Sequence, residues 1–169
     1  MPYFRSPDDP DSVSYINLKL TPEKIDEVPE AREWPVIREL LIAINSPQSQ
    51  LLSIGCGVFI YPPSAESAPW TAFAYVGYGL KEFELATDAK VYFPQFFHFT
   101  QHNRAKKETG ANVVFELRQT SFHDLKKACF TVDFIVRAWG SSEAELRARI
   151  DSHFRLLHEF LPLMGLMPL

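Results

Sequence analysis

Two histidines, His98 and His102, are four residues apart, the spacing that places metal-ligating side chains on one face of a helix. A zinc hydrolase of the His-Glu-x-x-His type needs a glutamate directly after the first histidine as its general base, but Phe99 occupies this position. No third ligand is fixed by spacing. We therefore interpret the pair as surface or partly buried histidines, keep it as a secondary metal candidate, and predict no cofactor.

A second candidate is a group of charged residues near the end of the chain. Apolar and polar residues alternate along 113–118 and 130–138, which predicts two half-buried strands joined as an antiparallel hairpin. The predicted face away from the core carries Glu116, Arg118, Asp133 and Arg137. These groups form either a solvated face with cross-strand charge pairs or, in a sheet curled into a half-barrel, a site that orients a polar ligand. We prefer the solvated face because charged residues are seldom buried.

Aromatic residues suggest one further site, a pocket in the concavity of a bent sheet. Glycines within 51–61 and 70–80 interrupt two predicted strands, which indicates a bulge, a bend or a close approach of backbone or ligand. The pocket would have apolar walls with a few polar tips, as small-molecule sites do. Its predicted lining is Tyr75, Tyr78, Phe96, Phe97 and His98, together with the charged group.

No stretch of the sequence carries a catalytic signature. Ser121, His123 and Asp124 include the residue types of a hydrolytic triad, but a triad needs side chains that converge from separate elements. The segment Gly55–Gly57 lacks the third glycine and the strand-to-helix context of a dinucleotide-binding loop. An enzyme is therefore the less favoured class.

The element that must support these candidates is a long helix near the C-terminus. Ser142 and Glu145 have the spacing of a capping box, which predicts where the helix begins, and Pro162 predicts where it ends. Between them an apolar stripe recurs at intervals of three and four residues: Leu146, Ile150, Phe154, Leu157 and Leu161. We expect this stripe to lie on the Phe/Val face of the hairpin.

The remaining elements follow in order along the chain. We predict an edge strand at 15–20, a brief helix after Thr21, a nearly all-apolar helix at 35–45, and strands at 51–61 and 70–80. Residues 81–86 either continue the second of these strands or form a third. The run at 91–104 is a helix opened by Pro94 or a strand, because periodicity alone does not separate the two in a short apolar run.

These elements predict an α+β fold. We expect a single domain over 13–169, with a strongly bent antiparallel sheet of about five strands, helices mainly on one face, and a mobile arm at 1–12. The order of elements resembles that of the small dimeric secretion chaperones, namely helix, three strands, helix, two strands, helix. This resemblance is one of element order and implies a dimeric, chaperone-like module.

Composition narrows the choice of partners. The chain has 17 basic and 21 acidic residues and a net charge of −4, so it lacks the basic field that nucleic-acid binding requires. Its apolar runs are far shorter than the roughly 20 residues that span a bilayer. We therefore predict no nucleic acid and no membrane as partners, and a cytoplasmic location.

The preferred hypothesis is a non-enzymatic protein-binding or assembly module, chaperone- or adaptor-like, that acts as a homodimer or on another protein. It rests on a surplus of apolar surface, including a Leu/Met-rich tail that should be seated in a groove of its own chain or of a neighbour. The predicted interface residues are Trp34, Phe93, Leu163, Met164, Leu166 and Met167. The alternative is the small-molecule binder or enzyme with the aromatic pocket.

Overall fold

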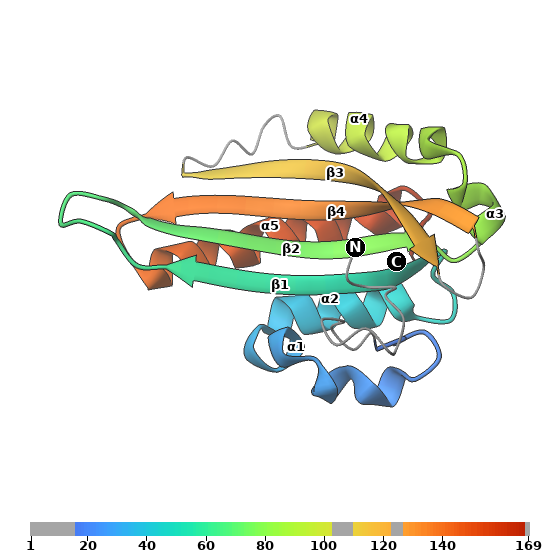
Figure 1. The fold of residues 1–169 in the computed structure, drawn as a ribbon, viewed down its shortest axis with the longest axis horizontal. Coiled ribbons are helices and arrows are strands. Elements are labelled where there is room, and N and C mark those ends of the chain that lie inside the picture. The colour runs from blue at the N-terminus through green and yellow to red at the C-terminus, as the bar shows by residue number, and fades with distance from the viewer. Residues whose placement is uncertain (1–15, 103–109, 123–126, 168–169) are drawn as a thin grey trace.

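The computed structural model describes residues 16–102, 110–122 and 127–167 (Figure 1). Residues 1–12, the predicted arm, and His123 lie outside this part of the chain. The elements, in order, are the 3-10 helix η2 (Pro22–Glu27), α1 (Pro29–Glu33), α2 (Pro35–Asn45), β1 (Leu51–Tyr61), β2 (Trp70–Leu80), α3 (Phe83–Ala86), the 3-10 helix η3 (Ala89–Tyr92), α4 (Phe93–His102), β3 (Ala111–Phe122), β4 (Lys127–Gly140) and α5 (Glu143–Leu163).

The strands form one antiparallel sheet in the order β1-β2-β4-β3. The α+β class and the β3–β4 hairpin are thus confirmed, with Glu116 opposite Asp133 in the register. About five strands were predicted, whereas the described residues form four. Residues 18–20 form a turn and 83–86 form the short helix α3, so the two additional strands were wrong.

One face of the sheet, the helix face, carries the main core. Figure 1 shows α5 running behind the strands, with α2 next to β1 and α4 next to β3. The stripe of α5 lies on the hairpin as predicted: Phe154 and Phe134 have ring centroids 6.0 Å apart, and both are fully buried. The opposite face is partly covered by α3, where Ala86 packs with Ile54 and Cys129.

A β-bulge in β1 changes which side chains face the core. The β1–β2 register shifts between Ser53 and Gly55. Leu52 and Ile54 therefore pack on the opposite face with α3, whereas Cys56 packs against the main core. Strict alternation of the apolar residues in the sequence would instead place 52, 54, 56, 58 and 60 on one face. The structure differs, because an extra residue in one strand inverts the alternation beyond it.

One of the two hydrogen bonds of the predicted capping box is present at the start of α5. The Ser142 hydroxyl accepts a hydrogen bond of 3.3 Å from the Glu145 backbone N–H. The Glu145 carboxylate, however, accepts from the Ser141 backbone N–H at 2.7 Å and from the Ser141 hydroxyl at 2.9 Å, one residue earlier than a capping box requires. Pro162 lies within the last turn, and the helix ends one residue after it.

The C-terminal tail docks in its own chain. The Leu166 carbonyl accepts hydrogen bonds from the Gln50 backbone N–H at 2.8 Å and from the Ser49 hydroxyl at 3.2 Å. Met167 is buried and belongs to the main core. Of the two places predicted for the tail, a groove of its own chain is the one observed.

Candidate functional site

Three of the four charged candidates meet on the opposite face of the sheet. The Arg118 Nε atom lies 3.0 Å from Glu116 Oε1 and 3.0 Å from Asp133 Oδ2. Arg137 is exposed, pairs with Asn112 in the register, and stands four residues along β4 from Asp133, outside this cluster. The hairpin register therefore brings together one arginine and two carboxylates.

Asp133 is the buried member of this cluster, with only 3% of its surface exposed. Burial raises the pKa of its carboxyl group, and the neighbouring Arg118 opposes this rise. A Cβ on Gly77 would lie 2.6 Å from Asp133 Oδ1, so the absence of a side chain at Gly77 makes room for the carboxylate. The solvated-face interpretation thus fails for Asp133, although Glu116 is exposed as expected.

The five aromatic and histidine candidates are not brought together. Tyr78 is fully buried on the helix face, where its hydroxyl lies 3.1 Å from Gln95 Oε1. Tyr75 lies on the opposite face with its ring centroid 6.0 Å from that of Phe73. Phe96 packs against Phe115 at 5.2 Å, while Phe97 and His98 are exposed on α4. Phe134 and Phe154 are among the side chains that fill the space between sheet and helices.

The predicted interface residues divide into two groups. Trp34 is buried in its own chain, with the Arg147 guanidinium 4.7 Å from its ring centroid, and the tail is docked as described above. Phe93 and Leu163 are 53% and 62% exposed, and Met164 is half-buried. The most exposed aromatic side chain of α4 is Phe97, at 63%, which we had assigned to a ligand pocket instead.

Leu163 and Met164 line a groove between α4 and the end of α5, whereas Phe93 and Phe97 are exposed on α4 itself. Phe96 and Phe99 hold α4 on the core through Phe115, which turns the other side of the helix outward. The groove has a volume of about 620 Å³ and is lined by His98, Gln101, His102, Phe160, Leu163 and Met164. We call the groove residues together with Phe93 and Phe97 the α4–α5 surface. It contains no Asp, Glu, Lys or Arg.

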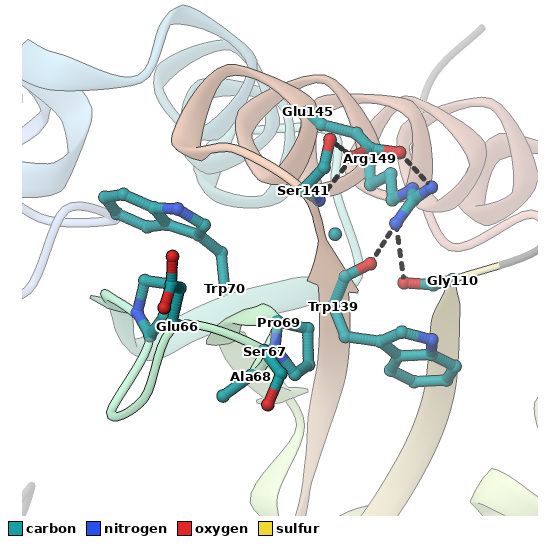
Figure 2. Close-up of a pocket in the computed structure, with 12 residues that line it drawn as sticks. Glu66, Ser67, Ala68, Pro69, Trp70, Gly110, Trp139, Ser141, Glu145 and Arg149 are labelled. Carbon is teal, nitrogen blue, oxygen red and sulfur yellow. Dashed lines mark hydrogen bonds and ion pairs between the residues drawn. The ribbon is translucent and has the colours of Figure 1, made fainter.

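A second depression, of about 710 Å³, lies where α5 begins and the β1–β2 loop turns (Figure 2). Figure 2 shows Arg149 paired with Glu145 and donating to the backbone carbonyls of Trp139 and Gly110. Hydrogen bonds from Ser141 lower the pKa of Glu145. These charged groups already fasten α5 to the ends of β3 and β4, so we interpret them as structural.

Comparisons with known proteins identify no relative from which a function could be inferred. No protein-family model, curated protein or solved structure matches the chain. Within 16–102, 110–122 and 127–167, no helix has both the length and the apolar character to span a bilayer. Among the same residues, no three side chains of His, Cys, Asp or Glu are grouped so that they could hold a metal ion.

Proposed function

We propose that the protein is a non-enzymatic protein-binding module, adaptor- or chaperone-like, that forms a homodimer through the α4–α5 surface. The observation that carries the proposal is the exposure of Leu163 in one uncharged groove and of Phe93 and Phe97 on α4, the helix that contributes His98, Gln101 and His102 to that groove. Large apolar side chains that gather on a surface are typical of interfaces between proteins. An isologous contact would place the same surface of a second copy against this one.

Two physical arguments support this choice of surface. Burying a side chain of this size is worth roughly 1.5–3 kcal/mol when it is fully exposed, so each of the three half-exposed groups would contribute about 1 kcal/mol on association. The surface also lacks charged residues, so two copies of a chain with a net charge of −4 would meet where like-charge repulsion is small. Both arguments favour self-association here over the more polar faces.

The alternative function, small-molecule binding in an aromatic pocket, has less support. Its predicted lining is divided between a buried position, Tyr78, the opposite face of the sheet and the exposed side of α4. A pocket needs side chains that converge on one cavity. We therefore do not propose an enzymatic or small-molecule function.

Sedimentation velocity on the full chain tests the proposal. We expect wild-type protein to sediment as a dimer at micromolar concentration, and a Phe97→Ser/Leu163→Ser variant to sediment as a monomer with unchanged circular dichroism. Phe59→Ser is the matched control, because Phe59 is 47% exposed but lies on β1. This strand is at the edge of the sheet opposite to β3 and α4. This control should remain dimeric.

Two outcomes would overturn the proposal. One is a wild-type chain that remains monomeric as its concentration is raised. The other is a dimer that Phe59→Ser weakens as much as the double variant does, which would place the interface elsewhere.

A further inference from the structure

The two histidines of α4 have the geometry of a metal-binding pair. Positions 98 and 102 are separated by one helical turn, both side chains are exposed, and both line the groove described above. Within the described residues, neither imidazole has a hydrogen bond or an ion pair; their contacts are ring contacts with Phe97 and Phe160. Their nitrogen lone pairs are thus available to a ligand.

A third donor lines the same groove, since Met164 brings a soft thioether sulfur to it from the C-cap of α5. We propose that His98, His102 and Met164 form a copper-binding site. The two imidazoles are its main ligands and the thioether is a third, weaker one, with water completing the coordination. The sulfur favours Cu⁺, and the imidazoles bind both copper oxidation states.

The donor set selects copper over other metals. Imidazole sites bind first-row divalent ions in an order that rises to Cu²⁺ and falls again at Zn²⁺. Hard ions such as Ca²⁺ and Mg²⁺ need several oxygen ligands, usually with carboxylates, and the groove contains none. The set also lacks the third imidazole or carboxylate of a typical catalytic zinc site.

The fold holds these ligands in place before the metal binds. Phe99 fixes α4 through rings of β3, β4 and α5, with centroids 4.9 Å from Phe115, 5.4 Å from Phe134 and 5.2 Å from Phe160. Both histidines therefore project from a helix that is anchored on its inner side. A preorganised pair binds more tightly than two independent imidazoles, because the second ligand is already at high effective concentration.

The other described histidines do not form such a pair. His153 is buried, and its Nδ1 atom lies 2.7 Å from the Arg149 carbonyl oxygen. His158 is five residues further along α5, a spacing that places the two rings in different directions. Loss of copper binding on substitution in α4 would therefore report on this site.

Isothermal titration and Cu²⁺ electron paramagnetic resonance on the full chain, purified without a histidine tag, test the site. We expect one Cu²⁺ per chain, with nitrogen hyperfine splitting and a weaker Zn²⁺ affinity. His98→Gln and His102→Gln should each lower the Cu²⁺ affinity by at least about tenfold, because each leaves a single imidazole. Met164→Leu should lower the Cu⁺ affinity, measured under ascorbate, more than the Cu²⁺ affinity.

A shifted pair is the matched control. The double variant T100H/H102Q keeps two histidines on α4, but at a spacing of two residues that does not place them on one face. It should bind Cu²⁺ like the single-histidine variants and keep the wild-type circular dichroism.

The copper site would be overturned if T100H/H102Q bound Cu²⁺ as tightly as wild type, or if a variant without both histidines did. Unchanged Cu⁺ affinity in Met164→Leu would remove the third ligand from the assignment. The three ligands lie in the groove of the α4–α5 surface, so a homodimer formed through this surface would cover them. The titration is therefore repeated on the Phe97→Ser/Leu163→Ser variant, which keeps all three ligands and is expected to be monomeric. Absence of copper binding in this variant overturns the copper site whatever the oligomeric state of the wild type, so the failures of the two proposals can be distinguished.

Discussion

The buried Asp133 carboxylate shows how one residue constrains its neighbours. It needs Arg118 on β3 as a counter-ion and an empty position on β2, which Gly77 provides. Removing one partner of a buried ion pair is costly, because it leaves an uncompensated charge. Gly77 and Arg118 are therefore both needed to accommodate the buried carboxylate of Asp133.

Replacing Gly77 by alanine should destabilise the fold by about 2 kcal/mol, the usual cost of forcing an extra group into a packed region. The new Cβ would meet Asp133 Oδ1 at 2.6 Å, and the carboxylate is held by Arg118. Urea unfolding measures the effect. Gly79→Ala on the same face is the control: its nearest neighbour is Thr131 Cγ2 at 3.3 Å, so a smaller loss is expected. Equal losses in both variants would contradict this account.

The sequence predicted the charged cluster better than the aromatic pocket, for a physical reason. Within a hairpin, alternation and register decide which side chains share a face, and the spacing of Glu116, Arg118 and Asp133 is local information. Whether that face is covered depends on distant elements, which is why the burial of Asp133 was missed. The aromatic set drew on two strands and a helix, and its convergence required a tertiary arrangement that no local pattern encodes.

At the scale of elements, strong periodic segments were predictable and short ones were not. The helix at 35–45, the strands at 51–61 and 70–80, and α5 each carry a long pattern with a clear start or end signal. By contrast, 81–86 is too short to distinguish a strand from α3. The bulge at Ser53 and Gly55 was indicated only as one of several meanings of a strand glycine.

The loop between α2 and β1 depends on a lysine from an earlier segment. Lys19 Nζ donates hydrogen bonds to the carbonyl oxygens of Ser46, Ser49 and Leu51 at 2.8, 2.9 and 2.9 Å. Its burial lowers the pKa of the ammonium group. One cation therefore joins three backbone acceptors: one at the end of α2, one in the following loop and one at the first residue of β1.

Lys19→Met should lower the free energy of unfolding by about 2 kcal/mol, because hydrogen bonds to a charged donor are lost while the stem keeps its packing. Thermal or urea unfolding at neutral pH measures this loss. Lys24→Met is the matched control: Lys24 forms an exposed ion pair with Glu27 at 3.8 Å, so its replacement should change stability by less than about 0.5 kcal/mol. A comparable loss of unfolding free energy in Lys24→Met would contradict the proposed role of the Lys19 hydrogen bonds in stabilising the α2–β1 loop.

For the whole molecule, the apolar residues predicted as one interface divide into a buried and an exposed group. Trp34, Leu166 and Met167 complete the packing of a single chain, whereas Phe93 and Leu163 are exposed, as is Phe97 from the predicted pocket. Sequence alone does not separate them, because an apolar side chain in a core and one in an interface have the same chemistry. The distinction depends on whether the tail reaches the α2–β1 loop, which is a property of the assembled fold.

This division predicts that stability and association respond to different changes. Removing residues 166–169 deletes the Leu166 carbonyl, with its two hydrogen bonds, and the buried Met167 side chain, but keeps every residue of the α4–α5 surface and places the new terminal carboxylate on Gly165, outside it. The truncated chain should lose about 2–4 kcal/mol of unfolding free energy, from a cavity and unpaired donors. It should nevertheless dimerise with nearly wild-type affinity under conditions in which it is folded.

The Phe97→Ser/Leu163→Ser variant should show the opposite behaviour: the monomer keeps its free energy of unfolding, but the dimer is lost. Urea unfolding and sedimentation of both proteins test this together, and a truncation that abolishes the dimer while the chain stays folded would show that the tail belongs to the interface after all.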